Sequence, residues 1–115
     1  MAYIEACKTA DLPQGEKKRV KLNGESVLVY HLEDGYYATQ NNCPHTLGPL
    51  HRGKIKDGCR ITCPLHRAEF DIRTGAVEKW ANFPPGVQLL NAIRGEKPLK
   101  TYSTQVEGGS LMVDV

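Results

Sequence analysis

Residues 43–66 read CPHTLGPLHRGKIKDGCRITCPLH, and each end of this segment carries one cysteine and one histidine. The first box is Cys43-Pro44-His45 and the second is Cys63-Pro64-Leu65-His66, with seventeen residues between His45 and Cys63. Thiolates and neutral imidazoles are ligands of zinc and of iron–sulfur clusters. The two boxes therefore predict a metal site with four protein ligands: Cys43, His45, Cys63 and His66.

The order of the ligands bears on which metal they bind. Structural zinc sites usually gather like ligands, with two cysteines in one knuckle and two histidines in the next. Here each box mixes the two types, which suits a two-iron cluster with thiolates on one iron and imidazoles on the other. The pattern resembles the Rieske ferredoxin family, whose signature is C-x-H, a spacer of similar length and C-x-x-H. A structural zinc ion is the alternative.

The resemblance implies one Rieske-type [2Fe–2S] cluster per chain. Cys43 and Cys63 would bind the inner iron, and His45 and His66 the outer one. It also implies an all-β Rieske fold, in which antiparallel sheets form a base domain and a small subdomain binds the cluster. We expect residues 1–115 to form this single domain, with the cluster-binding subdomain at approximately 41–72.

The residues around the boxes predict a low reduction potential. High-potential Rieske proteins carry an extra cysteine in each box, and the matching positions here are Gly48 and Leu65. Those proteins also place serine and tyrosine hydroxyls two and four residues after the second histidine, where this chain has Ala68 and Phe70. Hydrogen bonds to the cluster sulfurs stabilise the reduced state, so their absence favours a low potential.

Composition places the chain among small globular proteins. Its 115 residues are 40% hydrophobic and 24% charged, and the net charge of +2 is too small to argue for nucleic-acid binding. No run approaches the ~18 apolar residues of a membrane span, and no signal-like apolar core follows Met1. Four cysteines without a secretory signal indicate a cytoplasmic protein whose thiols bind metal.

Short alternating runs separated by glycine-containing turns predict strands throughout the chain. Asn23-Gly24 is a strong two-residue hairpin signal, and Thr74-Gly75 and Glu107-Gly108-Gly109 indicate further hairpins. The spacer between the boxes is expected to contain a basic loop. The expected strands are residues 3–6, 19–22, 26–32, 36–39, 60–62, 69–72, 76–78, 99–106 and 110–115.

Four further cysteines and histidines have simpler interpretations. Cys7 and Cys59 are expected to be small buried or inert residues, although a Cys59/Cys63 metal pair is conceivable. That pair would leave Cys43 without a role. His31 lies in an apolar strand and is expected to be structural, while His51 has no partner box.

Three features lie outside the family pattern or at its edges. Arg67 stands where the family usually has glycine, and the spacer adds the basic residues His51, Arg52, Lys54, Lys56 and Arg60. These charges could form a docking face for an acidic redox partner, or they could simply be solvated. Residues 83–86 resemble a proline-bearing loop that covers the cluster, and residues 87–96 resemble an insertion.

The predicted function is one-electron transfer from a reductase to a terminal Rieske, ring-hydroxylating oxygenase. The chain is expected to be the carrier rather than the enzyme, because no histidine follows His66 to build a mononuclear iron site. We expect no nucleic acid, membrane or small-molecule substrate among its partners. The alternatives are a small Rieske subunit of a reductase, such as nitrite reductase, and a zinc-stapled structural β-module.

Overall fold

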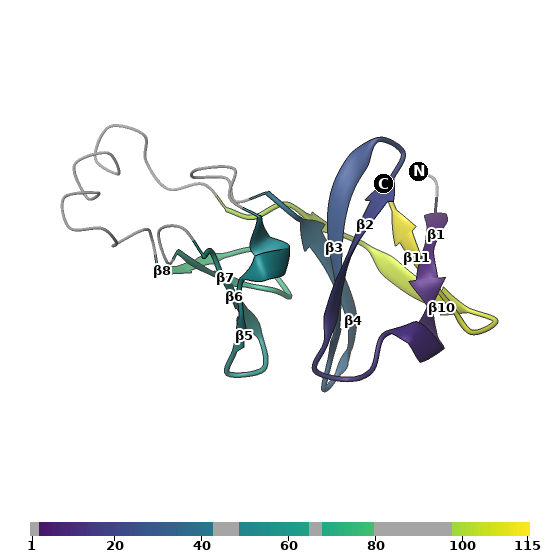
Figure 1. Cartoon of the computed structure of the whole chain (residues 1–115), viewed down its shortest axis with the longest axis horizontal. Coiled ribbons are helices and arrows are strands. Elements are labelled where there is room, and N and C mark those ends of the chain that lie inside the picture. The colour runs from purple at the N-terminus through teal and green to yellow at the C-terminus, as the bar shows by residue number, and fades with distance from the viewer. Residues whose placement is uncertain (1–2, 43–48, 65–67, 80–97) are drawn as a thin grey trace.

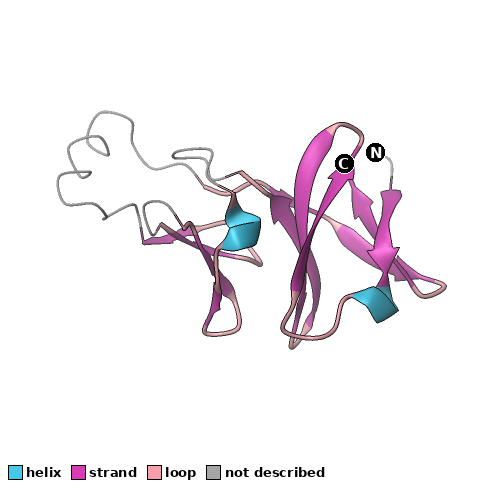
Figure 2. Cartoon of the chain, viewed as in Figure 1, coloured by secondary structure: helices cyan, strands magenta, loops and turns pink. Residues whose placement is uncertain are grey.

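The computed structural model describes residues 3–42, 49–64, 68–79 and 98–115. Strands dominate this part of the chain, two single-turn 3-10 helices interrupt them, and every strand pairing in it is antiparallel (Figure 2). The expected all-β fold is confirmed. No helix of the described residues is long and apolar enough to cross a membrane.

The strands form three sheets that follow one another along the molecule (Figure 1). The first has the order β1 (Tyr3–Lys8), β11 (Ser110–Asp114), β10 (Thr104–Glu107). The second has the order β2 (Lys17–Leu22), β3 (Glu25–Leu32), β4 (Gly35–Gln40), β9 (Thr101–Tyr102). The third has the order β5 (Ile55–Lys56), β6 (Arg60–Thr62), β7 (Glu69–Asp71), β8 (Val77–Lys79). The 3-10 helices are η1 (Thr9–Asp11) and η2 (Leu50–Arg52).

The β2–β3 hairpin has the turn that its sequence predicts. Asn23 and Gly24 have φ angles of 52° and 82°, and Leu22 pairs with Glu25 across the turn. Two consecutive positive φ angles match the twist of the flanking strands, and asparagine followed by glycine adopts them at little cost. This turn fixes the register of the whole hairpin.

Strand β3 separates two hydrophobic cores because its side chains alternate between the two faces of the second sheet. Val27 and Val29 pack into the core shared with the first sheet, which also contains Cys7, Leu12, Leu22, Ala38, Leu111 and Val113. Leu28, Tyr30 and Leu32 pack into the core shared with the third sheet, together with Leu50, Ile61, Cys63, Ala68, Phe70, Ile72 and Leu99. Residues 26–32, expected as a strand, thus carry apolar side chains on both faces.

Two expectations about the strands were wrong. Residues 99–106 do not form one strand of a final hairpin, because β9 pairs with β4 in the second sheet before β10 pairs with β11 in the first. The chain changes sheets at Ser103, whose carbonyl oxygen accepts a hydrogen bond from the Asp114 N–H at 3.0 Å. The basic spacer is also more ordered than a loop, since it contains η2 and β5.

A buried pair of hydroxyls links β3 to β4. The Tyr30 hydroxyl lies 2.7 Å from Thr39 Oγ1, and Thr39 Oγ1 donates to the carbonyl oxygen of Gln40 at 2.9 Å. Because the Thr39 proton is already used, the Tyr30 hydroxyl donates to Thr39. Burial raises the pKa of Tyr30 well above its usual value, so the phenol stays neutral.

This direction of donation predicts an asymmetry between two substitutions. Tyr30→Phe removes a donor and leaves Thr39 still bonded to Gln40, so it costs about 1 kcal/mol of unfolding free energy. Thr39→Val leaves the buried Tyr30 hydroxyl without its acceptor and costs up to about 3 kcal/mol. Urea denaturation of both variants measures the difference. A larger loss for Tyr30→Phe than for Thr39→Val would contradict the assignment.

Candidate metal centre

Cys63 lies in the interior at the end of β6. Its side chain is fully buried and belongs to the core that joins the second and third sheets. The Cys63 N–H donates to the carbonyl oxygen of Ala68 at 2.8 Å, and the neighbouring pair Thr62 and Glu69 continues the β6–β7 ladder. This hydrogen bond closes the β6–β7 connection at its base and fixes the backbone of Cys63.

The connection that carries the first box is closed in a similar way. Asn42 and Pro49 form an isolated antiparallel bridge, and the Leu50 N–H donates to the Asn41 carbonyl oxygen at 2.7 Å. The two residues that flank the segment 43–48 are thus held against each other. Leu50 is fully buried in the same core as Cys63, so both connections end on one packed surface.

Gly53 holds these two ends of chain against each other. A Cβ atom at this position would lie 1.8 Å from the carbonyl oxygen of Thr62, the residue before Cys63. The Gly53 N–H donates to Leu50 at 2.9 Å, and the Thr62 N–H donates to the carbonyl oxygen of Lys54 at 3.1 Å. Only glycine allows η2 to approach β6 this closely.

Of the four predicted ligands, the structure places Cys63. Cys43, His45 and His66 lie outside the described residues, as do Arg67 and the segments 83–86 and 87–96. Within the described ranges no three histidine, cysteine, aspartate or glutamate residues form a metal-binding group. The complete ligand set therefore stays a prediction.

The remaining cysteines do not join the site. Cys59 lies directly before β6 and Cys63 directly after it, so four residue steps along an extended strand place their Cα atoms about 13 Å apart. A Cys59/Cys63 metal pair is thus excluded by the strand between them. Cys7 packs in the other core, where burial raises the pKa of its thiol.

Both described histidines make structural contacts. His31 Nδ1 donates to the Leu12 carbonyl oxygen at 2.8 Å, and the ring stacks on Tyr36 with centroids 4.1 Å apart. The structural role expected for His31 is confirmed. His51 is bonded twice by the buried side chain of Asn41: its N–H donates to Oδ1 at 3.0 Å, and its Nδ1 lies 3.1 Å from Nδ2.

Asn41 is a site residue that sequence reasoning missed. Its amide accepts from η2 through Oδ1 and donates to η2 through Nδ2, so His51 Nδ1 is an acceptor. Desolvation lowers the pKa of His51 most, and the positive charges of Arg19, Arg52 and Lys17 lower it further. Both effects favour this neutral form. The only sequence signal was an asparagine between a strand and the first box.

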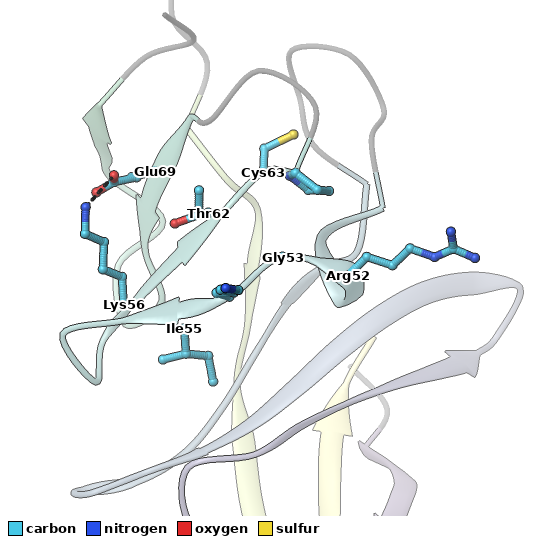
Figure 3. Close-up of a pocket in the computed structure, with 9 residues that line it drawn as sticks. Arg52, Gly53, Ile55, Lys56, Thr62, Cys63 and Glu69 are labelled. Carbon is cyan, nitrogen blue, oxygen red and sulfur yellow. Dashed lines mark hydrogen bonds and ion pairs between the residues drawn. The ribbon is translucent and has the colours of Figure 1, made fainter. Parts of the chain in front are cut away.

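A groove of about 610 Å³ opens beside Cys63 (Figure 3). Its lining includes Arg52, Lys54 and Lys56, and its one carboxylate belongs to the buried Glu69. Glu69 Oε2 lies 3.2 Å from Lys56 Nζ, and Oε1 lies 3.7 Å from an Arg60 guanidinium nitrogen. Two of the basic spacer residues therefore neutralise Glu69, while Arg52 and Lys54 line the groove and have no carboxylate partner among the described residues.

The family model of the Rieske [2Fe–2S] domain matches residues 2–103. This chain belongs to the Rieske family. It is 31% identical, over 99% of its length and 93% of the relative, to the biphenyl dioxygenase ferredoxin subunit of Pseudomonas sp. (strain KKS102).

Two solved Rieske proteins share the fold. Sphingomonas yanoikuyae B1 ferredoxin is 30% identical with a TM-score of 0.78, and the match covers 99% of both chains. A complex of reduced oxygenase and oxidized ferredoxin in carbazole 1,9a-dioxygenase contains a chain that is 28% identical. That match has a TM-score of 0.77 and covers 96% of this chain and 91% of the other.

Membership of the Rieske family establishes a Rieske-type [2Fe–2S] cluster as the cofactor and excludes the zinc alternative. The described residues fit this group, because a cysteine buried among apolar side chains is suited to an iron shielded from water. Hydrogen bonds hold the backbone beside each of the two segments that carry the predicted ligands. The chain is an electron-transfer protein.

The close approach of Gly53 to Thr62 predicts a destabilised Gly53→Ala variant. The added methyl group meets backbone rather than a flexible side chain, so we expect a loss of about 3 kcal/mol of unfolding free energy. Gly15→Ala is the control, since its Cβ meets nothing within 4 Å and costs only the strain of a φ of 89°, about 1 kcal/mol. Equal losses in denaturant unfolding would show that the contact with Thr62 is not critical.

Proposed function

We propose that this chain carries single electrons from a reductase to the terminal oxygenase of a ring-hydroxylating dioxygenase system. The observation that carries the proposal is the end-to-end match to ferredoxins of such systems. The related chain in the carbazole 1,9a-dioxygenase complex is a ferredoxin bound to an oxygenase. These relatives favour a separate carrier over the small subunit of a nitrite reductase.

The proposed ligands divide the work between two kinds of side chain. Cys43 and Cys63 would hold the inner iron, and His45 and His66 the outer one. The cluster supplies a site that accepts and releases one electron. The buried surroundings of Cys63 exclude water from the thiolate side, and the neutral imidazoles leave less negative charge on the outer side. The histidine side is then the natural exit for the electron.

Ala68 and Phe70 support a low reduction potential. Both side chains are fully buried in the core that contains Cys63, and neither carries a hydroxyl that could donate to a cluster sulfur. Fewer such donors leave the more negative, reduced state less stabilised. We expect the potential to lie near the lower end of the Rieske range of about −150 to +300 mV.

The same proposal includes the domain organisation and the location. Residues 1–115 would form one domain, in which approximately residues 41–72 bind the cluster. The third sheet, with its buried Cys63, supports a separate small layer for this purpose. A cytoplasmic location fits the use of cysteines as metal ligands, because reducing compartments keep thiols available.

Electron paramagnetic resonance of the dithionite-reduced protein, with metal analysis of the same sample, tests the cofactor and its ligands. We expect two irons per chain and the rhombic signal of a histidine-ligated cluster. Cys63→Ser and His66→Ala should lose that signal, whereas Cys59→Ser and His51→Gln should keep it. A signal that survives in either of the first two variants would refute the proposed ligand set.

Introducing a hydroxyl near the cluster should raise the potential. One added hydrogen bond of about 1 kcal/mol corresponds to about 40 mV for a one-electron couple. We expect an increase of this size in Ala68→Ser or Phe70→Tyr, measured by voltammetry. Ala76→Ser, at an exposed position, serves as the control. A wild-type potential in the upper half of the range would contradict the interpretation.

A further inference from the structure

Strand β2 presents a row of positive charge at the edge of the second sheet. Its sequence begins Lys-Lys-Arg-Val-Lys, and its outer side pairs with no strand among the described residues. Lysines on an edge strand protect it from pairing with other chains. Edge protection does not require the charges to gather on one face, and on β2 three of the four basic side chains do.

The register assigns the basic residues to that face. Lys17, Arg19 and Lys21 pair with Tyr30, Leu28 and Ser26, whereas Lys18 pairs with Val29. Paired side chains lie on the same side of a sheet. Since Tyr30 and Leu28 belong to the core that contains Cys63, the three cations lie on the face of the sheet that carries this core.

The row continues to the base of the first cluster-binding connection. Helix η2, which ends in Arg52, contacts β2. Arg19 and Lys21 line a hollow of about 440 Å³ together with Asn42, the residue before Cys43. We call Lys17, Arg19, Lys21 and Arg52 the β2 basic strip.

The strip is not neutralised within the described part of the chain. Lys8, Arg60 and Lys100 each lie within 4 Å of a carboxylate, but no residue of the strip does. Three residues of the strip act on one imidazole, since Arg19, Arg52 and Lys17 all lower the pKa of His51. Their fields therefore add at the end of the sheet near the predicted cluster.

We propose that the β2 basic strip docks an acidic surface of a protein that exchanges electrons with this chain. The proposal rests on the proposed function, because it assigns the strip to a redox partner. Docking would extend from the cluster end along the β2 edge. Uncompensated like charges beside Asn42, the residue before the first predicted ligand, attract an anionic partner and repel a cationic one.

A binding experiment on the cluster-loaded protein tests the surface itself. An oligoglutamate peptide serves as the acidic probe, and amide chemical shifts report where it binds. We expect shifts in β2 and η2, and affinity that falls as salt rises from about 20 mM to about 200 mM. Lys21→Gln should weaken binding about threefold, and Lys18→Gln, which removes the same charge from the same strand, should leave it nearly unchanged.

A kinetic experiment on the same variants tests the link to electron transfer. Hexacyanoferrate(III) takes one electron from the reduced protein and becomes hexacyanoferrate(II). The rate of this reaction should be lower for Lys21→Gln than for Lys18→Gln. With the cationic oxidant hexaamminecobalt(III), the rate for Lys21→Gln should not be lower. The resonance signal and the potential of each variant show whether the cluster is intact.

The outcomes separate the two proposals. Equal effects of Lys18→Gln and Lys21→Gln on peptide binding would overturn the proposal that the β2 basic strip is the binding surface, since only the net charge of the protein would then matter. Peptide binding at β2 without any effect on the anionic oxidant would overturn its assignment to a redox partner. Absence of the cluster signal from the reduced wild-type protein would refute the proposed function. The peptide titration would still decide whether the strip binds acidic chains.

Discussion

The burial of β3 on both faces is the constraint on which the rest of the molecule depends. Val27 and Val29 join the first sheet to the second, and Leu28, Tyr30 and Leu32 join the second sheet to the third. A one-residue slip of β3 against its neighbours would exchange the two sets of side chains. The Asn23-Gly24 turn and the ladder from Lys17–Tyr30 to Leu22–Glu25 prevent that slip. Cys63 depends on this register, because it packs in the core that contains Leu28 and Tyr30.

Backbone contacts organise the part of the molecule around Cys63 as much as side chains do. Each of the two connections is closed by main-chain hydrogen bonds, at Asn42–Pro49 and at Cys63–Ala68. Gly53 then allows the chain after one connection to lie against the chain before the other. Asn41 adds a side-chain bond to η2 on the same surface. Redox ligands work best when oxidation and reduction move them little, and closed connections on a packed core supply that rigidity.

Sequence reasoning predicted the features that arise from local chemistry. Hairpin turns at Asn23-Gly24 and Thr74-Gly75 and the alternation along β3 are encoded within a few residues. The spacing of the two boxes likewise indicated the Rieske family. Sequence reasoning missed features that depend on distant partners. The strand break at Ser103 follows from competition between β4 and β11 for neighbouring segments, and the role of Gly53 follows from its contact with Thr62. Neither leaves a pattern in the residues beside it.

Distant contacts also decide which of the basic residues have a carboxylate partner. The sequence predicted that the basic residues of the spacer could form a docking face, yet Lys56 and Arg60 form ion pairs with Glu69, which the third sheet buries. A buried carboxylate needs such partners, so these two cations belong to the fold. The lysines and arginine of β2 have no such task, because their strand is held by its register and by the apolar side chains of Val20 and Leu22. Charge that is not required for folding is free to act on other molecules, and here Arg19 and Lys21 lie beside Asn42, the residue before the first predicted ligand.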